Sequence, residues 1–137
     1  METPLILSAA VLTRIRHALA NSWSEKTSGC YNPSIAPPSY GQCAATSIVI
    51  SETFGGEILR SEILRHDGSV ARHFYNRIGG QRYDFTADQL DIPGYWSMPE
   101  YLDIPSDAAE AETELLPGQL VAMRIAFRMA MERGDAV

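Results

Sequence analysis

Cysteine, histidine and aspartate occur in this chain in an order that suits thiol catalysis. Cys43 stands in the segment SYGQCAAT (39–46), His73 follows thirty residues later, and Asp84 follows after a further eleven. In such chemistry the thiolate is the nucleophile, the histidine takes and returns its proton, and the carboxylate orients the histidine. We therefore predict Cys43, His73 and Asp84 as the catalytic residues of a Cys-His-Asp triad.

The cysteine is predicted to lie in the first turn of a buried helix. Ser39 and Gln42 match the capping-box pattern Ser-x-x-Gln, which predicts a helix from about 40 to 53 that ends at Gly55-Gly56. Unpaired N–H groups and the positive end of the helix dipole favour the thiolate of a cysteine placed there. The alternative for Cys43 is a small buried hydrophobe, the usual role of a free cysteine.

The histidine and the aspartate are predicted to meet on one hairpin. Strands over 70–78 and 81–86 flank Gly79-Gly80, which is a two-residue hairpin signal. This register places Tyr75 opposite Asp84 and gives His73, Tyr75 and Asp84 the same face, with His73 and Asp84 as diagonal neighbours. A bulged turn would shift the pairing by one residue and separate them. The alternative for His73 is a strand histidine bonded to a local partner.

Three further residues are predicted to bind substrate: Trp23, Gln42 and Tyr75. Residues 22–41 read as an irregular loop with three prolines, and Trp23 in this loop would form an aromatic wall beside the thiol. Its alternative role is a packing anchor. For Gln42 the capping box is one explanation; the other is an oxyanion donor, supplied by its side chain or by the Cys43 amide.

A competing histidine–carboxylate pair, His66 and Asp67, falls in a predicted turn, where both residue types are common for local reasons. Residue types that bind zinc are present, but none shows the paired spacing of a zinc site. No glycine-rich phosphate loop is present either. We therefore expect neither a metal nor a cofactor.

The remaining elements complete an α+β fold within a single domain, 1–137. An amphipathic helix is predicted over 8–21, a strand or a short helix over 57–64, an irregular acidic segment over 91–112, and a last helix from 116 or 117 to 133. The predicted architecture is a buried central helix bearing Cys43, packed against a small antiparallel sheet, with N- and C-terminal helices.

Charge and composition exclude several classes of partner. The net charge of −6 argues against nonspecific binding of nucleic acid or anionic membrane surfaces. No apolar stretch approaches the roughly 20 residues that cross a bilayer. Two cysteines without an export signal indicate reduced thiols in the cytoplasm, and a Cys30–Cys43 disulfide is the alternative for an exported protein.

Five short motifs carry a resemblance to a known family. The chain resembles the YunG-like family of small, largely uncharacterised bacterial proteins over residues 23–90, and more loosely in its C-terminal third. The motifs are Trp23-Ser24-x-x-Thr27-Ser28, Gly41-Gln42-Cys43-Ala44-x-Thr46, Phe54-Gly55-Gly56-Glu57-Ile58-Leu59, His73-Phe74-Tyr75-Asn76-Arg77 and Asp84-Phe85-Thr86-x-x-Gln89.

More distantly, a cysteine on a helix followed by a histidine and a carboxylate on strands is similar to papain-like and transglutaminase-like thiol enzymes. The chain departs from the papain pattern because no glutamine stands several residues before Cys43. This resemblance implies amide or acyl chemistry on a peptide or a small amide: hydrolysis, deamidation or acyl transfer.

A non-catalytic binding or interaction module on the same scaffold is the alternative function. The C-terminal helix carries Met123, Met129 and Met131, and methionine adapts to varied surfaces. This alternative predicts a homodimer through the C-terminal helix. In the competing interpretation the helix covers the core through Leu120, Met123, Phe127 and Met131, with Val121 and Ile125 widening the stripe.

Overall fold

An antiparallel sheet and a set of helices make up the fold, as the computed structural model shows for residues 6–65, 67–88 and 101–133. The sheet order is β3-β2-β1-β4, and all of its pairs are antiparallel. The predicted α+β class is therefore confirmed. In chain order the elements are α1 (Ala9–Ala20), α2 (Cys43–Phe54), β1 (Glu57–Leu64), β2 (Val70–Ile78), β3 (Gln81–Tyr83), β4 (Ile104–Ser106), α3 (Ala108–Glu112) and α4 (Gln119–Arg133).

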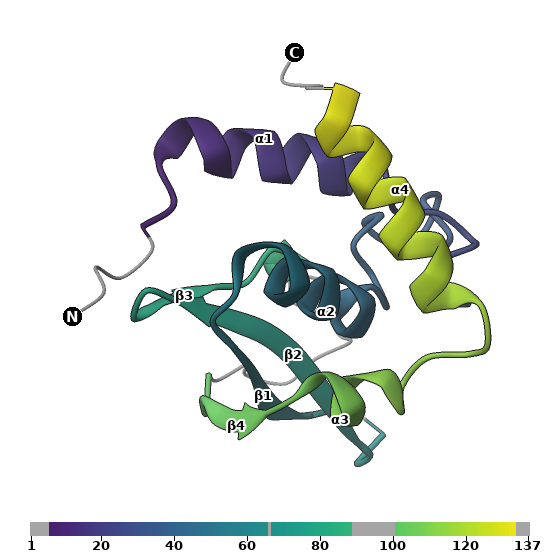
Figure 1. Ribbon diagram of the computed structural model, residues 1–137. Helices are drawn as coiled ribbons and strands as arrows, with labels where there is room; N and C mark the ends of the chain where they lie inside the picture. The colour runs from purple at the N-terminus through teal and green to yellow at the C-terminus, as the bar shows by residue number, and fades with distance from the viewer. Residues whose placement is uncertain (1–5, 66, 89–100, 134–137) are drawn as a thin grey trace.

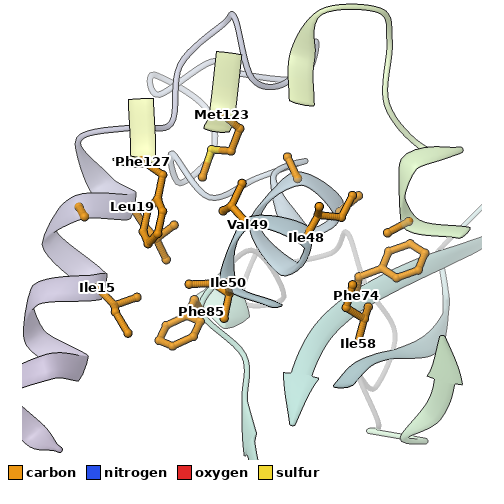
Figure 2. Close-up of a cluster of buried hydrophobic side chains, with 14 of the residues drawn as sticks. Ile15, Leu19, Ile48, Val49, Ile50, Ile58, Phe74, Phe85, Met123 and Phe127 are labelled. Atoms are coloured by element: carbon orange, nitrogen blue, oxygen red, sulfur yellow. The ribbon is translucent and has the colours of Figure 1, made fainter. Parts of the chain in front are cut away.

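Helix α2 lies at the centre, between the sheet on one side and α1 and α4 on the other (Figure 1). Its sequence is apolar on nearly every side, so it is stable only where every side is covered. Ile48, Val49 and Ile50 are fully or almost fully buried among side chains of α1, α4 and the sheet (Figure 2). The prediction of a buried central helix that bears Cys43 is confirmed.

The start of α2 differs from the prediction. Gln42 is the N-cap residue and makes no side-chain capping bond, so the capping-box prediction is wrong. The Ser39 hydroxyl donates instead to Asp88 Oδ1, and Gln42 Nε2 donates to the Ser24 carbonyl at 3.4 Å. Both side chains bond residues that are distant in sequence and so fix the loop of residues 22–41. The local spacing of Ser39 and Gln42 does not reveal these contacts.

Strands β1 and β2 have the bounds that the sequence predicts, but β3 is shorter. Ile78 pairs with Gln81 as expected, and the ladder ends at the pair Asn76–Tyr83. Asp84 then turns the chain, because its carboxylate accepts the Thr86 N–H at 3.2 Å. Among the described residues, β2 therefore has no paired strand on the β3 side from residue 70 to residue 75.

The segment predicted to be irregular, 91–112, contains regular structure in its described part. Strand β4 pairs with β1 at the sheet edge, where Pro105 is tolerated because an edge strand need not donate every N–H. The Asp107 carboxylate caps α3 by accepting the Glu110 N–H at 2.8 Å. The prediction is wrong for 104–112, and residues 91–100 lie outside the described part of the chain.

Helix α4 begins two or three residues later than predicted, after Gly118, whose φ of +89° is not helical. Leu120, Met123 and Phe127 face the core as expected. Val121 and Ile125 do not widen this buried stripe: with Met129 they form an exposed apolar line at spacings of four residues. None of the helices in the described ranges combines the length and apolar character that a bilayer crossing requires.

Candidate active site

Cys43 is the first residue of α2 and is partly exposed at one end of the molecule's central helix. The first N–H groups of an α-helix have no intrahelical acceptor, and Gln42 does not occupy them with its side chain. The thiol lines a hollow of about 190 Å³, whose wall comes from the 22–41 loop, α2, β2 and the segment before α4. Its residues are Cys30, Tyr40, Gly41, Cys43, Ala44, Arg65, Ala71, Arg72, Glu114 and Leu115.

His73 and Asp84 form a buried pair, as the hairpin register predicts. His73 Nε2 lies 2.6 Å from Asp84 Oδ2, and the two side chains are only 4% and 5% exposed. The His73 ring also makes a side-chain hydrogen bond with Cys43. Because Nε2 faces Asp84, Nδ1 is the ring nitrogen left for the thiol. The structure thus brings all three predicted catalytic residues together.

The end of β3 explains how Asp84 meets the ring of His73. Asn76 lies on the opposite face of β2 from His73. It points at α2 and donates from Nδ2 to the Ser47 carbonyl at 2.9 Å. The His73 side chain lies on the other face of the strand. Its ring stacks on the ring of Tyr75, with 5.9 Å between the ring centroids. Because β3 ends at Tyr83, the chain turns at Asp84, and this turn brings the Asp84 carboxylate to the His73 ring.

The pair is ionised as an imidazolium and a carboxylate at neutral pH. Burial by itself would lower the pKa of His73, but the hydrogen bonds and charges of Asp84 and Cys43 outweigh it and raise the pKa to about 10. Burial likewise pushes the pKa of Asp84 up, yet His73, Tyr101 and the Thr86 N–H hold it below its ordinary value. Asp84 therefore keeps its negative charge inside the protein, and His73 keeps its proton.

Tyr101 is a member of the site that the sequence did not reveal. Its hydroxyl donates to Asp84 Oδ2 at 2.6 Å, the same oxygen that faces His73. Burial and the neighbouring Asp84 raise the pKa of Tyr101, so the hydroxyl stays protonated and remains a donor. The guanidinium of Arg82 lies over the Tyr101 ring, 4.6 Å from its centroid, in a cation–π contact. Seventeen residues separate Tyr101 from Asp84, and no local pattern links them.

The three predicted substrate-binding residues lie around the triad but not on the hollow beside Cys43. Trp23 donates from Nε1 to Thr46 Oγ1 at 3.0 Å and lines a separate hollow of about 480 Å³ together with Asp84. Gln42 is fully buried, and its Oε1 has no hydrogen-bond partner among the described residues. The Tyr75 hydroxyl donates to Asp103 at 2.9 Å and bonds Ser61.

In the ranges 6–65, 67–88 and 101–133, no three cysteine, histidine or acidic side chains are grouped in a way that could hold an ion. His66, half of the competing pair, lies outside the described residues. Asp67 accepts hydrogen bonds from Ser69 within its own turn, which is the local role that a turn aspartate usually has.

Replacing Asp84 by asparagine should destabilise the fold in a pH-dependent way. We expect a loss of about 3 kcal/mol at pH 5, because breaking a buried ion pair leaves an uncompensated charge on His73. The pKa of Asp84 is held below its ordinary value of 3.8. The stabilisation is therefore present above pH 3.8 and is lost as the pH falls through the lower folded-state value. Urea unfolding of both chains from pH 6 to pH 2 measures this; a gap that stays constant over that range would contradict it.

Comparison with known proteins places the chain beside one described family. The family model described as YunG protein matches residues 11–129. A protein of Bacillus subtilis (strain 168) described as "Uncharacterized protein YunG" is 34% identical over 120 residues, which cover 88% of this chain and 94% of that protein. No solved structure matches the chain. The match extends well beyond residues 23–90, and the broader papain-like resemblance has no counterpart in these comparisons.

Proposed function

We propose that this chain, which belongs to the YunG family, is a cysteine-dependent enzyme that acts on an amide or acyl group. The observation that supports this most is the linked set Cys43, His73 and Asp84, with a 2.6 Å contact between the last two. Hydrolysis, deamidation and acyl transfer share the same first half-reaction. The substrate class in all three is a peptide or a small amide.

The proposed first step uses the charges already present. An imidazolium beside Cys43 favours the thiolate, which attacks the carbonyl carbon of the substrate. The carbonyl oxygen becomes an oxyanion, and the Cys43 amide at the uncapped start of α2 is the donor that stabilises it. His73 then returns its proton to the leaving nitrogen as the carbon–nitrogen bond breaks, and a thioester on Cys43 remains.

In the proposed second step, neutral His73 takes a proton from water or from an acceptor amine, which attacks the thioester. Carbon–sulfur cleavage regenerates the thiolate, and the proton stays on His73. Asp84 remains ionised throughout and holds the ring in position, and Tyr101 holds Asp84. Water gives hydrolysis or deamidation, and an amine gives transfer. The free thiols of Cys30 and Cys43 agree with the cytoplasmic location that this proposal retains.

The test measures alkylation of Cys43 by iodoacetamide across pH. In the Cys30→Ser chain Cys43 is the only thiol, because the sequence has two cysteines. We expect a rate near pH 6 to 7 well above that of an ordinary thiol, because the imidazolium of His73 beside Cys43 favours the thiolate. An ordinary thiol instead gains about tenfold per pH unit below its pKa of about 8.5. A profile of that ordinary kind would contradict the proposal.

A turnover measurement completes the test. The probe is p-nitrophenyl acetate, an activated ester, with Cys43→Ser as the matched control that keeps the shape of the side chain. We expect a burst that acetylates Cys43, visible as the mass of one acetyl group, followed by steady release of nitrophenol. Release no faster than that of Cys43→Ser would overturn the enzymatic proposal.

The alternative, an interaction module that forms a homodimer through α4, stays a prediction. The observation in its favour is the exposed apolar line of Val121, Ile125 and Met129 on α4. If a second copy covers this line, Ile125→Glu should shift the mass in solution from dimer to monomer without lowering the unfolding temperature of the monomer. Light scattering over a concentration series measures the mass, with Arg128→Glu on the same helix as the control. A wild-type chain that is monomeric throughout the series would contradict this alternative.

A further inference from the structure

A second thiol shares the hollow beside Cys43. Cys30 comes from the 22–41 loop, both cysteines line the same space of about 190 Å³, and both are free. The two cysteines are thirteen positions apart in the sequence, unlike the Cys-x-x-Cys spacing of a redox motif.

Tight packing of two chain segments holds Cys30 at this wall. Gly41 has a φ of +76°, and a Cβ atom at this position would lie 2.5 Å from Ser28 Oγ and 3.1 Å from Cys30 Cβ. Cys30 Sγ would lie 3.6 Å from the same point. The Cys30 N–H donates to Ser28 Oγ at 3.1 Å, which fixes the turn. The segment of Cys30 therefore touches the backbone two residues before Cys43.

The two thiols have different surroundings, and the difference assigns them different roles. Cys43 is partly buried and bonded to His73, whose positive charge favours a thiolate. Cys30 is exposed on a loop that is held by turns rather than by a sheet ladder. A thiolate of the first kind attacks an oxidant, and a thiol of the second kind resolves the product.

We infer that Cys30 and Cys43 form an oxidative modification site at which hydrogen peroxide converts the two thiols into an intrachain disulfide. The Cys43 thiolate attacks one oxygen of the peroxide, the O–O bond breaks, and the departing hydroxide takes up a proton to give water. Cys43 is then a sulfenic acid. The Cys30 sulfur loses its proton and attacks the Cys43 sulfur, the S–O bond breaks, and a second water leaves.

One hydrogen peroxide and two thiols thus give one disulfide and two waters. The peroxide is reduced, both sulfurs are oxidised, and a thiol reductant reverses the reaction. A disulfide requires the two Cα atoms to lie within roughly 7 Å, and any adjustment falls on the loop that carries Cys30. The inference does not depend on amide chemistry, because it needs only a nucleophilic Cys43. For the proposed function it means that oxidation of Cys43 stops catalysis.

The experiment titrates the full chain with hydrogen peroxide and reads the products by intact mass and by non-reducing peptide mapping. We expect the wild-type chain to lose two hydrogens, to yield one cross-linked peptide pair containing Cys30 and Cys43, and to run as a monomer on a non-reducing gel. Dithiothreitol should restore both thiols. Cys30→Ser, which has no resolving thiol, should instead gain two oxygens on Cys43 as the sulfenic acid proceeds to the sulfinic acid.

Two outcomes would overturn the inference. The first is a wild-type chain that accumulates sulfinic acid on Cys43 as quickly as Cys30→Ser does, because Cys30 would then give no protection. The second is a disulfide found only between two chains. Ester turnover measured on reduced protein is a separate readout, so an inactive chain that still forms the intrachain disulfide would contradict the proposed enzyme and leave the oxidation site intact.

Discussion

Replacing His73 by glutamine is expected to lower ester turnover by about 10²–10⁴-fold, the range that a general acid–base usually contributes. Glutamine is close to histidine in size and can still bond Asp84, but it cannot carry the proton that the thiol gives up. Turnover of p-nitrophenyl acetate measures the loss, in the Cys30→Ser chain so that Cys43 is the only thiol.

Alkylation of Cys43 at pH 7 is a second readout with a smaller expected change. A thiol with a pKa of about 8.5 is about 3% thiolate at this pH, so losing the imidazolium reduces the rate by at most about 30-fold. If His73 had only a structural role, His73→Gln would lower the stability of the chain without lowering both ester turnover and the alkylation rate of Cys43. The control is His17→Gln on α1. Equal rates for both variants and the parent chain would remove His73 from the mechanism.

Asp84 and Tyr101 should affect the same readouts less than His73 does. Asp84→Asn removes the charge that raises the pKa of His73, whereas Tyr101→Phe removes only one hydrogen bond to Asp84. Because each acts through the histidine, the order of effect expected from the geometry is His73, then Asp84, then Tyr101. This order follows the distance of each group from the thiol along the chain of hydrogen bonds.

Local patterns predicted the parts of the site that depend on neighbours in sequence. The alternation of residues along β2 and the two glycines at 79–80 set the hairpin register, and that register placed His73 and Asp84 together. The prediction succeeded although β3 ends before Asp84, because a diagonal contact needs only the turn and the first pairs of the ladder. The apolar run of α2 predicted its burial in the same local way.

Contacts between distant segments account for the parts that were missed. The pattern Ser-x-x-Gln predicts a cap, but Asp88, forty-nine residues from Ser39, takes the hydroxyl instead. Tyr101 reaches Asp84 from beyond an intervening segment. Strand β4 exists because β1 offers an edge, not because its three residues favour a strand. In each case a tertiary partner overrode a weak local preference.

Gly56→Ala is expected to lower the free energy of unfolding by about 4 kcal/mol, the sum of backbone strain and overpacking. Gly55 and Gly56 both have positive φ, +78° and +79°, so the turn between α2 and β1 uses both glycines. A Cβ on Gly56 would lie 2.3 Å from the Arg77 carbonyl oxygen, which is backbone and cannot give way. The added methyl group would push the start of β1 away from β2, the strand that carries His73.

Gly55→Ala is the matched control for this prediction, because nothing lies within 4 Å of its Cβ position. Its φ of +78° and ψ of −155° belong to a region that only glycine adopts easily, so strain alone should cost about 1–3 kcal/mol. Urea unfolding of the two variants separates strain from contact. Equal losses would show that β1 and β2 tolerate the extra atom. A larger loss at Gly56, accompanied by slower alkylation of Cys43, would show that the close approach of these strands also positions the site.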